Sequence, residues 1–166
     1  MKETIHIGIA CVGETPTPTP GRLVSLAAAV GTDVWRANFQ APEDHPWVCP
    51  RYLTKYPKIW GELTEKPVAL KEGLKSYCRW ISRYHGTHIA VGRAMDFWWL
   101  YSTLIENTGK CSFGCDGLLD TATMVQIQRD TTQQLTKKHF WVSLRPWEAA
   151  TTAWGVVVPP RKQGKK

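Results

Sequence analysis

Three strand-like segments follow one another within the first 39 residues of the chain. Residues 5–12 alternate apolar and small side chains, residues 23–30 are mostly apolar, and residues 34–39 alternate again. Only Gly31, Thr32 and Asp33 separate the second segment from the third, and they suit a tight turn. The segments therefore predict a three-strand meander, one face of which other elements must cover to form a core.

The middle of the chain alternates between helical and strand patterns. Residues 67–84 are predicted to form a helix with Pro67 in its first turn, because apolar side chains recur at helical spacing. These side chains are Leu70, Leu74, Tyr77, Cys78 and Ile81. Residues 87–91 form the next predicted strand, and residues 94–107 form a second helix that Gly109 ends.

Three weaker segments complete the prediction. Residues 41–66 are rich in Pro, Trp and Tyr and lack clear periodicity, which predicts a loop with short helical turns. Residues 120–128 and 148–154 have helical character. The order of three strands, helix, strand, helix and further helical material predicts an α/β fold: a mixed β-sheet with helices on its faces.

The chain length of 166 residues fits one domain, which we assign to residues 1–158, followed by a basic, flexible tail at 159–166. The sequence contains no apolar run long enough to cross a bilayer, and its N-terminus lacks the apolar stretch of a secretory signal. We therefore expect an intracellular, cytoplasmic protein with no membrane partner. The odd number of cysteines, five, favours reduced thiols.

The chain is basic. It has 21 Lys and Arg against 14 Asp and Glu, which gives a net charge of +7. This charge favours polyanionic partners, because cationic side chains neutralise phosphates and release counterions. A solvated basic surface with a loose basic tail is the alternative, since charge alone carries no specificity.

Two segments carry the strongest motifs. In residues 89–101 a strand pattern ends in a small-residue turn, and Asp96-Phe97 then opens a helix. Residues 111–121 read Cys-Ser-Phe-Gly-Cys-Asp-Gly-Leu-Leu-Asp-Thr. They are similar to the Pro-Phe-Gly…Ala-Leu-Asp-Thr segment in one branch of the DEDDh (proofreading-type) 3′–5′ exonucleases. From about residue 5 to about residue 154 the chain resembles this family, which implies a ribonuclease H-like fold.

The resemblance also shows where the chain departs from the family. Asp96 matches the aspartate of the second motif. The first motif, Asp-x-Glu, corresponds to residues 10–12 without any acid, or to residues 12–14 with only Glu14 retained. The third motif has a histidine and, after four further residues, an aspartate; here Trp141 and Pro146 stand in their places.

The missing carboxylates argue against hydrolysis. Two-metal hydrolysis places two divalent ions about 4 Å apart, and Mg²⁺ prefers carboxylate ligands. Asp96 and Glu14 are the residual catalytic candidates, and Asp96 is a metal ligand only if the chain is active. We therefore expect a pseudoenzyme without a cofactor, with Mg²⁺ or Mn²⁺ required only by an active form. Asp96 and Asp120 also suit helix caps, and Glu14 suits a solvated position.

Basic and aromatic residues suggest a nucleic-acid surface. Exposed aromatic rings among basic side chains stack on unpaired bases, and the chain has nine tryptophans. The candidates are Lys137, Lys138, His139, Arg93, Trp98 and Trp141. Exposed tryptophans also anchor protein partners. Because Trp98 and Trp99 are adjacent on a predicted helix, we expect one to face the core and the other to point outward.

Three functions remain open at the level of sequence. The first is an inactive exonuclease-like domain that binds nucleic acid or a nucleoprotein partner. The second is an active metal-dependent 3′–5′ exonuclease with rearranged ligands, drawn from Glu14, Asp96, Asp120 and Glu148. The third is a protein-interaction or structural module of a larger assembly.

Overall fold

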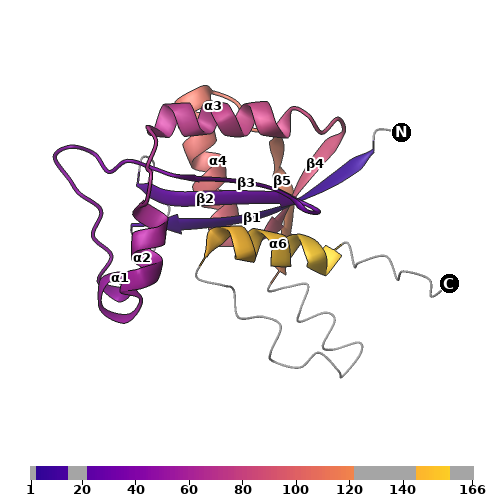
Figure 1. Ribbon diagram of the computed structural model, residues 1–166. Helices are drawn as coiled ribbons and strands as arrows, with labels where there is room; N and C mark the ends of the chain where they lie inside the picture. Colours follow the sequence, from indigo (N-terminus) through magenta and orange to yellow (C-terminus); the bar gives the residue numbers. More distant parts are fainter. Residues whose placement is uncertain (1–2, 15–21, 122–144, 158–166) are drawn as a thin grey trace, which may run out of the picture.

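A five-stranded mixed sheet forms the centre of the computed structural model, which describes residues 3–14, 22–121 and 145–157 (Figure 1). The strands are β1 (Thr4–Gly13), β2 (Leu23–Val30), β3 (Asp33–Asn38), β4 (Thr87–Gly92) and β5 (Phe113–Asp120). They lie in the order β3-β2-β1-β4-β5. The first three form an antiparallel meander, and β4 and β5 run parallel to β1. The predicted α/β fold with a mixed sheet is confirmed.

Helices cover both faces of the sheet (Figure 1). They are α1 (Pro50–Lys55), α2 (Pro57–Thr64), α3 (Leu70–Ile81), α4 (Ala94–Thr108) and α6 (Pro146–Val157). Side chains of α3 and α4 pack on one face with Ile7 and Ile9, whereas α6 packs on the other face with Ala10. Alternate residues of β1 therefore belong to different cores, as the pleat of a strand requires.

Small side chains allow α6 to lie close against the sheet. Ala10, Ala27 and Ala29 of the strands contact alanines of α6. Gly8 is tighter still, because a Cβ atom added there would lie 2.0 Å from the backbone oxygen of Ala150. The position therefore requires glycine for close approach of the helix and not for an unusual backbone angle.

The predicted start of the helix at Pro67 is wrong. Helix α3 begins at Leu70, because the backbone before it pairs with the sheet instead. Val68 N–H donates to the Asn38 carbonyl (2.9 Å), and Gln40 N–H donates to the Val68 carbonyl (2.9 Å). The helix also ends at Ile81, earlier than predicted. The segment before it has the expected short helical pieces, α1 and α2.

The helix predicted over residues 120–128 starts one residue too early. Asp120 is the last residue of β5, which pairs in parallel with β4, and Thr121 after it is helical. The remainder of that prediction, from residue 122, lies outside the described residues. The final helix, predicted over residues 148–154, is present and extends beyond both predicted ends, from Pro146 to Val157.

The described residues bear on membrane association and on the state of the cysteines. None of the helices in those ranges is both long and apolar enough to cross a membrane. Cys11, Cys49, Cys78 and Cys111 are free thiols. The tail predicted at 159–166 lies outside the described residues.

Candidate functional site

Asp96 lies in the first turn of α4, directly after β4. The backbone of Arg93 is extended and forms the N-cap of the helix, so Asp96 is its third residue. Only 2% of Asp96 is exposed. The cap interpretation of Asp96 is wrong: the carboxylate that accepts a hydrogen bond from the first helical N–H, that of Ala94, belongs to Asp120 (3.0 Å).

The Asp96 carboxylate is held by an arginine on the same turn. Arg93 Nε donates to Oδ2 at 2.8 Å, and Arg93 Nη2 donates to Oδ1 at 2.7 Å. Burial raises the pKa of Asp96, and the two hydrogen bonds from Arg93 oppose that rise. Both oxygens face a fixed cation in the two-point geometry that makes Arg–carboxylate pairs strong. A divalent ion would have to compete with Arg93 for the same two oxygens.

A cysteine thiol from β1 completes the surroundings of this turn. Cys11 Sγ donates to the backbone carbonyl of Asp96 at 3.4 Å. Burial raises the pKa of Cys11 well above its ordinary value, so the thiol keeps its proton and acts as a donor. The end of β1 thus meets α4 through a neutral thiol rather than through a carboxylate.

Glu14, the other residual candidate, is paired as well. Its side chain is only 6% exposed, and Arg22 Nη2 lies 2.7 Å from Oε2 in an ion pair that is not aligned as a hydrogen bond. Val48 N–H donates to Oε1 at 3.4 Å. The prediction that Glu14 is solvated is wrong, because its side chain is buried and forms an ion pair with Arg22.

The remaining ligands of the active alternative have other partners. Asp120 caps α4, and Glu148 lies on α6 with Oε1 at 3.9 Å from Arg145 Nη1. Within residues 3–14, 22–121 and 145–157, no three His, Cys, Asp or Glu side chains are close enough together to hold a metal ion. These residues do not fit the pair of divalent ions that two-metal hydrolysis requires.

The predicted nucleic-acid residues are described only in part. Lys137, Lys138, His139 and Trp141 lie outside the described residues. Arg93 has a 47% exposed side chain, although its guanidinium is engaged by Asp96. Trp98 is 47% exposed whereas Trp99 is 3% exposed, which confirms that one ring points outward and the other into the core. Met95, one helical turn before Trp98, is also exposed.

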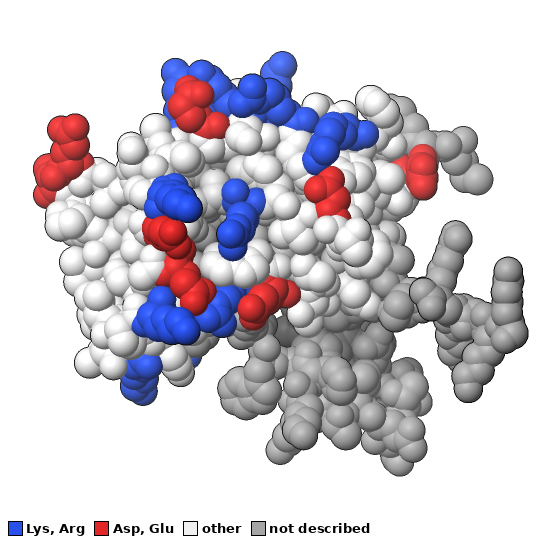
Figure 2. All heavy atoms as spheres, viewed as in Figure 1, with Lys and Arg blue, Asp and Glu red and all other residues white. Residues whose placement is uncertain are grey.

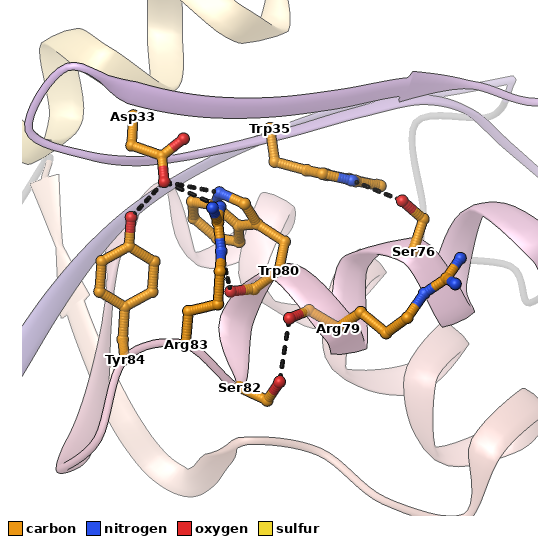
Figure 3. A network of polar contacts seen from close by, with 8 residues as sticks. All are labelled: Asp33, Trp35, Ser76, Arg79, Trp80, Ser82, Arg83 and Tyr84. Carbon is orange, nitrogen blue, oxygen red and sulfur yellow. Dashed lines mark hydrogen bonds and ion pairs between the residues drawn. The ribbon is translucent and has the colours of Figure 1, made fainter.

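A second polar cluster ties the β2–β3 turn to the end of α3 (Figure 3). Asp33 Oδ2 accepts hydrogen bonds from Trp80 Nε1 (3.1 Å), Arg83 Nη2 (2.8 Å) and the Tyr84 hydroxyl. The Tyr84 bond is the largest cause of a lowered Asp33 pKa. The pKa of Tyr84 is raised to about 12, chiefly by burial of the hydroxyl and secondly by its hydrogen bond to Asp33. The cluster fixes one end of β3 against the helix.

Sequence reasoning missed a groove beside β3. It has a volume of about 530 Å³ and is lined by residues of β3, α2 and α3, together with Trp147 of α6. Arg36 of β3 stacks over the Trp147 ring, 4.5 Å from its centroid. Figure 2 shows positive and negative side chains mixed on this face. The sequence offered little signal for the groove, because it depends on which strand is at the edge of the sheet.

No protein-family model matches this chain, and a search of curated proteins finds no similar sequence.

Proposed function

We propose that this chain is an exonuclease-like domain of ribonuclease H-like fold that binds single-stranded nucleic acid without hydrolysing it. The meander followed by two parallel strands agrees with that fold, and so does an aspartate in the first turn of the helix after β4. The motif resemblance of residues 89–101 supports the same assignment.

The observation that carries the proposal is the ion pair between Arg93 and Asp96. In a two-metal enzyme the aspartate after this strand would offer its oxygens to a divalent ion. Here Arg93 supplies the positive charge from within the chain, and it engages both oxygens. Glu14 is also paired with an arginine, because Arg22 Nη2 lies 2.7 Å from its Oε2. Both residual carboxylates therefore have an internal cation in place of a metal.

The binding part of the proposal is supported by charge and by an exposed aromatic ring. The net charge of +7 favours a phosphate backbone as partner. Trp98 and Met95 form an exposed apolar patch on the first two turns of α4. Stacking of a base on one aromatic ring contributes about 1–3 kcal/mol. Trp98 is the described residue that we assign to stacking.

Filter binding with an end-labelled single-stranded oligonucleotide tests the proposal. We expect saturable retention that weakens as salt rises, and Trp98→Ala should weaken it about fivefold or more. Leu53→Ala is the matched control, because Leu53 is equally exposed (46%) but lies on α1. The oligonucleotide recovered after incubation with Mg²⁺ should keep its full length on a gel. Absence of retention at low salt, or shortening of the oligonucleotide, would contradict the proposal.

A further inference from the structure

The short helices α1 and α2 carry a group of basic side chains with no acid among them. Arg51, Lys55 and Lys58 all fall between Asp44 and Glu62, and the sequence has no other charged residue in that interval. All three side chains are exposed, and α1 buries none of its residues. We call these three residues the α1 basic patch.

The helix geometry places two members of the patch on one side of α1. Arg51 and Lys55 are four residues apart, which corresponds to about 6 Å along the helix axis and to neighbouring positions on its surface. Lys58 lies in the first turn of α2, directly after the break at Tyr56. Leu53 is two residues from Arg51 and from Lys55, so it lies on the opposite side of α1.

Aromatic packing fixes the backbone that carries the patch. The Tyr52 ring lies 6.3 Å from the Tyr56 ring and 5.7 Å from the ring of Trp60, which is itself buried. Tyr52 also packs on the apolar cluster that contains Val12 and Val24 of the sheet. Because the two helices are held in this way, binding through the patch would order only the ends of its side chains.

The patch keeps its positive charge. Among the described residues, no carboxylate oxygen lies within 4.0 Å of Arg51, Lys55 or Lys58. The pKa of Glu62 is lowered chiefly by its hydrogen bonds to Arg145, at 2.5 and 2.9 Å, and less by Lys58. Glu62 is therefore already paired, and it does not neutralise the patch.

The acids that precede the patch lie apart from it. Glu43 and Asp44 belong to the loop before α1. Figure 2 shows acidic side chains over this loop, separated from the basic side chains near α1 and α2. The local excess of positive charge is complementary to an anionic partner.

The patch lies near the turn that begins α4. Burial chiefly raises the pKa of Tyr52, and the charges of Arg93 and Asp96 also act on its hydroxyl, in opposite directions. The ring of Tyr52, between the two α1 members of the patch in sequence, is therefore close to that turn. Trp98, the ring assigned to base stacking, follows Asp96 by two residues.

We propose that Arg51, Lys55 and Lys58 bind the phosphate backbone of a single-stranded nucleic acid whose base stacks on Trp98. The inference rests on the proposed function and adds the path of the strand, from α4 across α1. Phosphate contacts of this kind position a strand and supply affinity without reading its sequence. The substrate class is therefore a single strand of any sequence.

The salt dependence of oligonucleotide retention tests the inference. Each phosphate that a protein neutralises on a single strand contributes about 0.7 to the slope of log affinity against log salt concentration. The variant Arg51→Gln/Lys55→Gln/Lys58→Gln should therefore flatten this slope by about two units. It should also weaken retention at least about tenfold at about 0.1 M salt. An unchanged slope would overturn the inference.

A control variant separates the patch from net charge. Lys71→Gln/Lys75→Gln/Arg79→Gln removes the same three charges from the exposed side of α3, where Glu72 lies 2.8 Å from Lys75. It should change the slope by less than about half a unit. Equal flattening in the two variants would mean that net charge alone governs binding, and it would overturn the inference.

Single variants keep the test decisive if the triple α1 variant fails to fold, as judged by circular dichroism. Arg51→Gln and Lys55→Gln should each flatten the slope by about 0.7. No change in either one would overturn the inference. A lipid surface is the other anionic partner: binding to phosphatidylserine vesicles that the α1 variant loses, with its oligonucleotide slope unchanged, would assign the patch to lipid and overturn the inference.

Failure of this inference differs from failure of the proposed function. Trp98→Ala should lower the affinity without changing the salt slope, because stacking neutralises no phosphate. If Trp98→Ala weakens retention and the α1 variant does not, only the phosphate path is overturned. If the natural chain retains no oligonucleotide at low salt, the proposed function falls and the inference falls with it.

Discussion

Arg93 and Asp96 are three residues apart, and their side chains meet over the first turn of α4 in two hydrogen bonds of 2.8 and 2.7 Å. The spacing places the two side chains on neighbouring positions of the helix surface. The carboxylate is buried, while the arginine extends from it to the surface. A group that could otherwise bind a metal therefore contributes to folding as half of an ion pair.

We expect Arg93→Ala to lower the free energy of unfolding by about 2–3 kcal/mol, because it leaves the buried Asp96 without its cation. This expected loss of stability is smaller than the loss on breaking a fully buried ion pair, since the Arg93 side chain is half exposed. Urea denaturation measures it, with Arg51→Ala on the exposed surface of α1 as control.

The loss of unfolding free energy in Arg93→Ala should become smaller as the pH is lowered. Without Arg93, burial raises the pKa of Asp96 further above its unfolded value, so protonation on lowering the pH removes the buried charge. The double variant Arg93→Ala/Asp96→Asn should recover most of the stability at neutral pH. If Arg93→Ala costs no more than Arg51→Ala at any pH, the ion pair does not stabilise the fold.

Asp33→Asn tests the cluster at the end of α3. The pKa of Asp33 is lowered in the folded chain, chiefly by the Tyr84 hydrogen bond, so its carboxylate stabilises the fold above the unfolded pKa of about 3.9. That contribution is lost as the pH falls through the lower, folded pKa. We expect Asp33→Asn to cost about 1 kcal/mol at neutral pH, because the side chain is 43% exposed.

The difference between Asp33→Asn and the natural chain should vanish below the folded pKa of Asp33. Thermal unfolding between neutral and strongly acidic pH measures it. The control, Asp44→Asn, makes the same change of charge on an exposed turn. A difference that stays constant with pH would exclude the carboxylate charge as its source.

Gly8→Ala tests the seating of α6 on the sheet. The new Cβ would lie 2.0 Å from the Ala150 backbone oxygen, so the helix must move. We expect a loss of about 1–3 kcal/mol, as for other overpacked cores.

Gly61→Ala is the matched control, because the added Cβ on α2 meets no atom within 4 Å. It should stabilise the chain by about 0.5–1 kcal/mol, since alanine favours a helix over glycine. Chemical denaturation of the two variants side by side measures both effects. Equal stability of the two variants would mean that α6 is not packed against Gly8.

Local pattern was enough to predict much of the fold. Alternating apolar side chains predicted the three-strand meander. Apolar side chains at helical spacing predicted α3 and α4, with ends within a few residues of those observed. Strand β5 was missed because Gly114 and Gly117 interrupt its apolar pattern. The start of α3 was wrong because Val68 pairs with β3, and such pairing depends on residues distant in sequence.

The site was less predictable, because its pairs join distant or unsuspected residues. Glu14 was expected to be solvated, yet its side chain is paired with Arg22, the residue before β2. Arg93 was assigned to nucleic acid, although its position three residues before Asp96 was a visible signal for an ion pair. The free edge of β3 depends on strand order, which local pattern does not define.

The most direct test is electron paramagnetic resonance of Mn²⁺ titrated into the natural chain. It shows whether the Asp96 carboxylate binds a metal ion or stays paired with Arg93. We expect no Mn²⁺ bound at submillimolar concentration, and the same titration for Asp96→Asn. Binding of two ions per chain that is lost in Asp96→Asn would show a working metal centre and contradict the account.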